Sequence, residues 1–300
     1  MFSSSIFSSL QRLRTGSIYP PIEIIWASHP LWPNPPNHIT PLEKIHISIL
    51  DSSFNPPTLA HLALLNTPRP GHDGISDDYD AKLLLLSVRN ADKQLKPGDA
   101  TYVQRVEMMV DFTEDLGANS NTAVAIIDEP TFVGKSKLFR TFLKEKVHLM
   151  EVQLTFMMGF DTLERLFAPK YYESSEEKMF KALRGFFASP SSSNDEEPGD
   201  GSRVVYARRS SSSYPTPAPD SDSNLEEPVN SLAQTISTFF SSSALPSSCV
   251  LMIDIGEDVW SISSSEVRDG VRKESERSHP WREMVTERTR RYIVEHGLYK

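Results

Sequence analysis

The sequence is poor in cysteine and has no long apolar run. Cys249 is the one cysteine among 300 residues, which excludes an internal disulfide and a zinc site built on several thiolates. No stretch approaches the roughly 18 apolar residues of a membrane-spanning helix, so we expect no membrane partner. The net charge of -9 argues against nucleic acid as the main partner. A nucleotide stays compatible with this charge, because one phosphate site needs only a few local cations.

The common phosphate-binding and catalytic motifs are also absent. "VGKS" at 133–136 resembles the end of a P-loop, but Glu129 stands where that loop needs glycine. No G-x-G-x-x-G follows the first predicted strand. The eight histidines show no metal-ligand spacing, and no Ser-His-acid or Cys-His set indicates a covalent nucleophile. We therefore expect no metal held by side chains and no covalent intermediate.

Apolar segments alternate along the chain between strand-like and helix-like patterns. The strand candidates are near-continuous apolar runs, typical of strands buried on both faces; they are 43–50, 81–88, 122–128, 151–159, 203–209 and 249–256. The helix candidates lie between and after them, at 58–66, 101–115, 138–147, 176–188, 229–240 and from about Ser263 into 280–296. This alternation predicts an α/β fold with a doubly wound, mostly parallel, Rossmann-like sheet in a single domain.

Segments of unusual composition surround this predicted domain. We expect a domain at 41–300 after an N-terminal extension at 1–40, with insertions at about 189–202 and 209–228. Both insertions are rich in serine, proline and acids, so we expect them to be disordered. Residues 1–21 contain serine and arginine but no acid, as transit peptides do. We favour an amphipathic helix with Ile6, Phe7, Leu10 and Leu13 on one face, and hence the cytoplasm or nucleus over the mitochondrion.

The stretch "DSSFNPPTLAHLALL" at 51–65 follows the first predicted strand. Thr58 is placed as the N-cap of a helix, and Pro57 restrains the chain just before it. His61 then lies in the first helical turn, where unpaired backbone N–H groups favour a phosphate. A histidine there can donate a hydrogen bond to a phosphoryl oxygen. From spacing alone, a histidine that contacts only solvent is an equally good interpretation.

A second stretch, "DIGEDVWSISSSEVRDGVRK" at 254–273, follows the last predicted strand. It places three serines at a helix start and Arg268 one turn further on, which together can hold an anion. Alone, such a pattern is usually just a capped helix. In a parallel sheet, ligands bind beyond the carboxyl ends of the strands, where both stretches would meet.

Four motifs in order resemble the nicotinamide mononucleotide adenylyltransferases of the nucleotidylyltransferase superfamily, in a divergent fungal-type branch. "SSFNPPTLAH" at 52–61 is similar to the family's G-S-F-N-P-x-T-x-x-H, and "ISSSEVR" at 262–268 to I-S-S-T-x-x-R. "GFDTL" at 159–163 is similar to G-x-D-x-L, and "YIVEHGLY" at 292–299 to the closing Y-I-x-x-H-x-L-Y. Ser52 departs from the family's glycine, a residue that allows close backbone approach.

This resemblance implies transfer of the adenylyl group of ATP to nicotinamide or nicotinic acid mononucleotide, giving NAD (or its nicotinic acid analogue) and pyrophosphate. The implied cofactor is Mg²⁺ bound through the ATP phosphates. The residues implied as catalytic are His61, Lys93 and Arg268. Those implied to bind ATP are Ser53, Phe54, Thr58, His61, Lys96, Ser264, Ser265 and Arg268. Those implied to bind the mononucleotide are Asn55, Phe132, Gly159, Asp161, Tyr172 and Arg208.

Two other interpretations stay open. One is a nucleotide-binding protein, or a slow ATP hydrolase, that has lost the transfer; Ser52 is the feature that keeps it open. The other is a sister nucleotidylyltransferase with a different phosphorylated acceptor. Oligomeric state and the choice between the two mononucleotides are not predicted.

Overall fold

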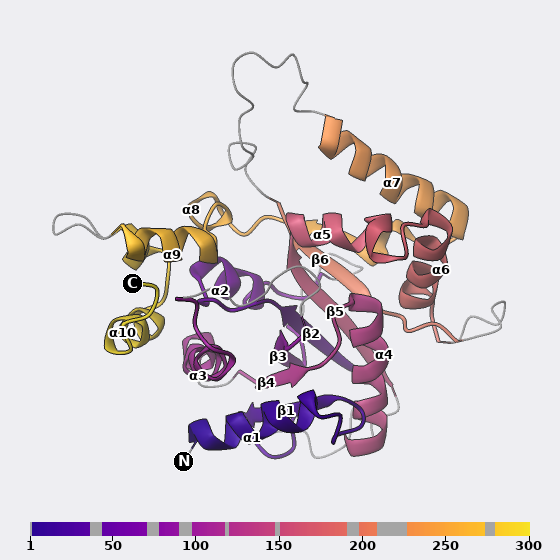
Figure 1. Cartoon of the computed structure of the whole chain (residues 1–300). Helices are drawn as coiled ribbons and strands as arrows, with labels where there is room; N and C mark the ends of the chain where they lie inside the picture. The colour runs from indigo at the N-terminus through magenta and orange to yellow at the C-terminus, as the bar shows by residue number, and fades with distance from the viewer. Residues whose placement is uncertain are drawn as a thin grey trace, which may run out of the picture.

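The computed structural model describes residues 2–36, 44–70, 78–89, 98–117, 120–147, 151–190, 198–208, 227–273 and 280–300. These residues form one seven-stranded sheet with helices on both faces (Figure 1). Most of the two predicted insertions lies outside the described residues. The end of the first insertion is packed, because the backbone N–H groups of Asp200 and Ser202 donate to Gly185 and Phe186.

The sheet is mostly parallel, as predicted. Its order is β1-β4-β3-β2-β5-β6-β7, and only the β1–β4 pair is antiparallel within it. The strands are β1 (Ile22–Ala27), β2 (Ile45–Asp51), β3 (Ala81–Ser87), β4 (Thr122–Ile127), β5 (Val152–Gly159), β6 (Arg203–Ala207) and β7 (Val250–Ile253). Strand β1 was not predicted from the sequence, since it is a half-buried edge strand without a buried apolar run.

The helices α2 to α7 cover the two faces of the sheet. On one face lie α2 (Leu59–Leu65) and α3 (Tyr102–Thr113). On the other lie α4 (Phe132–Phe142), α5 (Phe160–Leu166), α6 (Glu176–Phe187) and α7 (Glu227–Ser243). Figure 1 shows α4 and α6 to the right of the strands and α2 and α3 to the left. Because consecutive side chains of a strand point to opposite faces, each central strand contributes to both cores.

The N-terminal segment packs on the domain as a helix, α1 (Phe2–Arg14). Ile6, Leu10 and Leu13 are buried against the face that carries α3, but Phe7 is 57% exposed. The predicted inclusion of Phe7 in the apolar face was wrong, because residues at i, i+4 and i+7 form one stripe and Phe7 lies a quarter-turn away from it. No helix in the described part of the chain is long and apolar enough to cross a membrane.

Helix α4 begins six residues earlier than the sequence indicated. Thr131 caps it by accepting a hydrogen bond from the backbone of Gly134 at 3.0 Å. The "VGKS" segment is therefore the first turn of a helix, and it forms no phosphate loop. At the other end of the chain, α9 (Ser264–Arg272) and α10 (Glu287–Glu295) are separate helices that share a third core cluster around Trp281 and Tyr299.

The chain reverses its direction across the sheet between β2 and β5. From β2 it winds outward through β3 to β4, and it then returns to place β5 on the other side of β2. At such a reversal the loops after the two central strands diverge and leave a crevice at the carboxyl edge of the sheet. The stretch after β2 and the "GFDTL" motif after β5 therefore flank the same crevice.

Candidate active site

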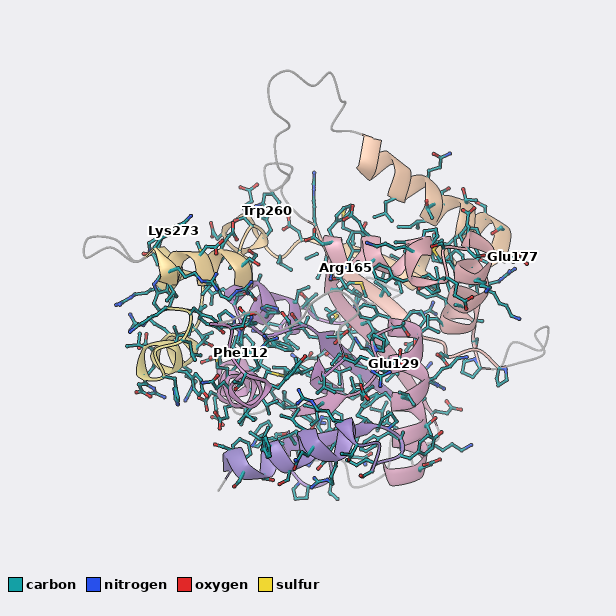
Figure 2. The ribbon with its side chains drawn as sticks, viewed as in Figure 1. Phe112, Glu129, Arg165, Glu177, Trp260 and Lys273 are labelled. Carbon is teal, nitrogen blue, oxygen red and sulfur yellow. The ribbon has the colours of Figure 1, made fainter. Side chains whose placement is uncertain are left out.

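A cavity of about 340 Å³ occupies this crevice. It is lined by the β2–α2 turn, the β5–α5 junction, the end of β6, and the segment from α8 (Glu257–Trp260) into α9. Figure 2 labels Trp260 at α8, beside α2. Of the predicted site residues, the lining includes Ser53, Thr58, His61, Gly159, Asp161, Arg208, Ser264, Ser265 and Arg268.

The β2–α2 turn is anchored to the sheet and to the core. The backbone N–H of Ser52 donates to the carbonyl of Leu85 on β3 at 3.3 Å, Phe54 is fully buried, and the Asn55–Pro56 peptide is cis. The positive φ of the turn, 43°, is at Phe54 and not at Ser52. Serine in place of glycine at position 52 therefore imposes no left-handed backbone strain.

His61 is held by the cap of its own helix. The backbone N–H of Thr58 donates to His61 Nδ1 at 3.0 Å, and the Thr58 hydroxyl lies 2.8 Å from the same nitrogen. Because a backbone N–H can only donate, Nδ1 is the acceptor, and Nε2 carries the hydrogen of the neutral ring. Nε2 lies 2.9 Å from Ser52 Oγ. The imidazole therefore presents a donor toward the cavity side of the turn.

Burial lowers the pKa of His61 to about 4 from its usual 6.5. Between these values the unfolded chain binds more protons than the folded one, so we expect the free energy of unfolding to fall as the pH drops through this window. His61 contributes at most about 1.4 kcal/mol per pH unit to this change in the free energy of unfolding. NMR titration should show the ring neutral down to about pH 5.

The matched control for this titration is His61→Gln. Its unfolding should lack the histidine contribution between pH 6.5 and 4, so the free energy of unfolding of wild type should fall relative to that of the variant as the pH drops. A ring that protonates near 6.5, or the same pH dependence in both proteins, would contradict the assignment.

Helix α9 starts as predicted, with Ser263 as N-cap. The Ser263 hydroxyl accepts from the backbone N–H of Glu266 at 3.2 Å, and the Glu266 carboxylate accepts from the backbone N–H of Ser263 at 2.8 Å. This reciprocal capping box fixes the direction in which the helix starts. The N-terminal end of α9 consequently faces the cavity with Ser264 and Ser265.

Two hydrogen bonds join the two stretches that the sequence singled out. The Ser264 hydroxyl donates to the carbonyl of Pro56 at 2.7 Å, and Arg268 Nη1 donates to the carbonyl of Asn55 at 2.6 Å. Arg268 Nη1 also bonds to the carbonyl of Ser264, and Nη2 donates to the Ser265 hydroxyl at 3.1 Å. Residues more than 200 positions apart in sequence thus form one hydrogen-bonded unit around the cavity.

The comparison with protein families gave no matching family model. A curated protein of Schizosaccharomyces pombe, provisionally named a nicotinamide mononucleotide adenylyltransferase, is 36% identical over 155 residues. The match covers 49% of this chain and 53% of that protein, so the chain spans about half of the relative's length. The chain is related to this adenylyltransferase. The resemblance inferred from the four motifs is thereby confirmed.

Solved structures give a weaker likeness. Two structures of Plasmodium falciparum nicotinic acid mononucleotide adenylyltransferase, one complexed with APC and one with NaAD, each align with a TM-score of 0.46. They are 15% and 16% identical, over 85% of this chain and 97% of theirs. At these scores the likeness adds nothing to the fold described above.

Asn55 belongs to the β2–α2 turn, but it is buried and does not line the cavity. Its Oδ1 accepts from the Tyr299 hydroxyl at 2.9 Å and from the backbone N–H of Ala100 at 3.3 Å. Burial raises the pKa of Tyr299, so its hydroxyl stays protonated and donates. Asn55 therefore connects the turn to the closing "HGLY" segment. This placement favours a structural role over the predicted contact with the mononucleotide.

Several other residues implied by the resemblance lie away from the cavity lining. Phe54 is in the core and packs against the His61 ring at 5.2 Å. Phe132 packs edge-on against Phe156, with ring centroids 5.6 Å apart, and the Tyr172 hydroxyl donates to the carbonyl of Leu166. Lys93 and Lys96 lie outside the described residues. The aromatic rings that do line the cavity are Phe160 and Trp260.

A buried ion pair at the floor of the site was not predicted. Lys135 on α4 bonds to Asp51 at the end of β2, and their side chains are 5% and 8% exposed. Asp51 lines the cavity. Because Lys135 balances its charge, this carboxylate does not strongly repel an anionic ligand. The pair joins residues 84 positions apart, and no local pattern indicates it.

No group of three or more metal-binding side chains occurs among the residues that the structure describes. The cavity-lining residues include two carboxylates, Asp51 and Asp161, and the first is paired with Lys135. This donor set is too small for a dedicated metal cage. It fits a Mg²⁺ ion that keeps water and phosphate oxygens as most of its ligands.

Proposed function

We propose that the chain transfers the adenylyl group of ATP to nicotinamide or nicotinic acid mononucleotide, forming the dinucleotide and releasing pyrophosphate. The observation that carries the proposal is the junction of the two motifs through Ser264 and Arg268 around a single cavity. The named activity of the Schizosaccharomyces pombe relative supports the same assignment.

The proposed reaction is a direct displacement at phosphorus. An oxygen of the mononucleotide 5′-phosphate forms a bond to the α-phosphorus of ATP, and the bond from that phosphorus to the bridging oxygen of the β-phosphate breaks. Pyrophosphate leaves with that oxygen. The side chains need only align two polyanions and stabilise charge on the phosphoryl oxygens. This agrees with the lack of a nucleophilic set in the sequence.

The hydroxyls and the guanidinium of α9 are suited to the leaving β- and γ-phosphates. Nη1 of Arg268 is committed to the carbonyls of Asn55 and Ser264. Nη2 donates to the Ser265 hydroxyl. It is therefore the guanidinium nitrogen that would bond to a phosphate oxygen in place of that hydroxyl. Lys93 and Lys96 remain proposed phosphate ligands from the resemblance.

The opposite wall of the cavity is suited to the mononucleotide. Gly159 ends β5 and Asp161 lies in the first turn of α5. Arg208 follows β6, where its backbone N–H donates to the carbonyl of Ile253 at 3.1 Å. We assign Arg208 to the 5′-phosphate and Asp161 to a hydroxyl or amide donor. Mg²⁺ bound through the ATP phosphates would neutralise part of their charge.

The test is incubation of the purified protein with Mg-ATP and each mononucleotide, measuring dinucleotide formed against ATP lost. We expect dinucleotide and pyrophosphate in equal amounts from at least one mononucleotide. ATP loss without dinucleotide would indicate the hydrolase, and ATP binding without either product a binding protein. Product only with another phosphorylated acceptor would indicate a sister enzyme.

Trp260 provides an independent test of where the nucleotide bases bind. Trp260 lines the cavity, whereas Trp32 and Trp281 are buried in the core. Stacking of a base on an aromatic ring contributes about 1–3 kcal/mol. We expect a change in tryptophan fluorescence on titration with ATP or with mononucleotide, and this change should be absent in Trp260→Phe. Trp26→Phe is the control and should retain it, since Trp26 lies on β1 and is not among the cavity-lining residues. A signal that persists in Trp260→Phe would contradict the placement.

A further inference from the structure

The Ser52 hydroxyl accepts the hydrogen bond that His61 would otherwise donate to a ligand. The neutral ring has one N–H, at Nε2, because Nδ1 accepts from the backbone of Thr58. That N–H points to Ser52 Oγ at 2.9 Å. A glycine at position 52, as in the family's motif, has no side chain that could accept it.

The Ser52 hydroxyl can accept a hydrogen bond from His61 and donate one to a ligand at the same time. A hydroxyl has one hydrogen to donate and lone pairs to accept with. Because Oγ accepts from His61, its own hydrogen is directed away from the ring. Ser52 lines the cavity and its backbone is fixed by the bond to Leu85 on β3. An anion in the cavity beside this turn is the partner that a hydroxyl hydrogen there would meet.

We infer that Ser52 is the direct ligand of the phosphate at the β2–α2 turn and that His61 acts through it as a positioning residue. The interaction runs from the Thr58 N–H to His61 Nδ1, from His61 Nε2–H to Ser52 Oγ, and from the Ser52 hydroxyl to a phosphoryl oxygen. Hydrogen bonds in series polarise one another, so His61 strengthens the donation by Ser52. The inference rests on the proposed function for the identity of the phosphate, which is the α-phosphate of ATP.

The lowered pKa of His61 agrees with this chain. A protonated ring would carry a hydrogen on Nδ1 as well, and the bond from the Thr58 N–H would be lost. At neutral pH the ring stays neutral and keeps both links. The charged groups beside the turn have partners of their own: Asp51 at the end of β2 pairs with Lys135, and Arg268 on α9 pairs with Asp99 and bonds to the carbonyl of Asn55.

The experiment combines binding and turnover in a double-mutant cycle on the full chain. ATP in which a methylene joins the α- and β-phosphorus serves as the probe for calorimetry. We expect Ser52→Ala to bind the probe about two- to twelvefold more weakly, and to turn over at least about tenfold more slowly. His61→Ala should then cost less than about threefold when added to Ser52→Ala, because the two residues act as a unit.

Two further variants keep the test decisive. Ser52→Gly restores the residue of the family's motif and tests whether His61 reaches the phosphate once the hydroxyl is gone. Ser87→Ala removes a hydroxyl at the end of the neighbouring strand β3, where it lies within hydrogen-bond distance of the carbonyls of Arg89 and Glu129 and donates to one of them. This variant controls for loss of stability. Ser87 is not among the cavity-lining residues.

The outcomes separate this inference from the proposed function. Wild-type binding and turnover in both Ser52 variants, with the full effect of His61→Ala in each, would overturn the inference and leave the transfer reaction standing. If wild type makes no dinucleotide, the proposed function fails, and the contact between Ser52 and the phosphate is then tested by binding of the probe alone. Weaker probe binding in Ser52→Ala but not in Ser87→Ala then supports the contact, and equal binding refutes it.

Discussion

Replacing His61 with alanine is expected to lower the rate of dinucleotide formation by on the order of a hundredfold. The affinity for ATP should change by less than about threefold. The reason is that the donor chain from Thr58 through His61 to Ser52 strengthens as charge accumulates on the phosphoryl oxygens, so it stabilises the transition state more than bound ATP. Single-turnover kinetics with calorimetry on the same samples would separate the rate from the affinity.

The chain itself suggests the control for this variant. Helix α3 begins with Thr101 as N-cap and Gln104 at the third position, and the Gln104 side chain accepts from the Thr101 N–H at 2.9 Å. His61→Gln would build the same capping box at α2, and should keep the stability of wild type near pH 7. Full turnover in His61→Gln would show that the histidine serves only as a cap. An unfolded His61→Ala would leave His61→Gln as the informative variant.

The sequence predicted most of this sheet because six of its strands are apolar runs with turn residues at their ends. It missed β1, whose half-buried "IEIIWA" pattern lies between prolines and pairs with β4 at the edge. The helix predicted from the sequence also begins six residues after the true start of α4. The "VGKS" segment contains a glycine and was compared with a phosphate loop, whereas the side chain of Thr131, three residues before Gly134, is what starts the helix.

The site was predictable where one local segment contains all the determinants. Thr58 and His61 lie within one helical turn, as do Ser264 and Arg268, and the spacing of each pair fixes its geometry. Contacts between distant segments could not be predicted. The pairing of Asp51 with Lys135, and the hydrogen bond from Tyr299 to Asn55, depend on chain segments that meet only in the folded protein.

The aromatic residues show the same limit in another form. Phe132 and Tyr172 follow β4 and α5 in sequence and are aromatic, which made them reasonable ligands by type. In the structure their rings complete the core on the α4–α7 face. Trp260 could have been predicted, since it stands two residues before the "ISSSEVR" motif that lines the cavity.

Replacing Arg268 with alanine is expected to weaken ATP binding by about ten- to a hundredfold, the range for a charge-assisted hydrogen bond. Mononucleotide binding should change little. The guanidinium lines the cavity at α9, whereas Asp161 lines it from the first turn of α5 and Arg208 from just after β6. Calorimetry with each ligand alone would measure the contrast. Arg272→Ala is the matched control, since Arg272 lies one turn further along α9 and pairs with Asp269.

Arg268 has a second role that the experiment has to separate from phosphate binding. Through Nη1 it also holds the carbonyl of Asn55, so its loss frees the β2–α2 turn as well as removing a charge. Ser264→Ala removes the other bond to that turn and leaves the charge in place. If looseness of the turn were the whole effect, Ser264→Ala would reproduce it, and both ligands would weaken equally in Arg268→Ala. Arg268→Lys keeps the charge but cannot bridge the Asn55 carbonyl and a phosphate oxygen in one plane, so it should recover only part of the affinity for ATP.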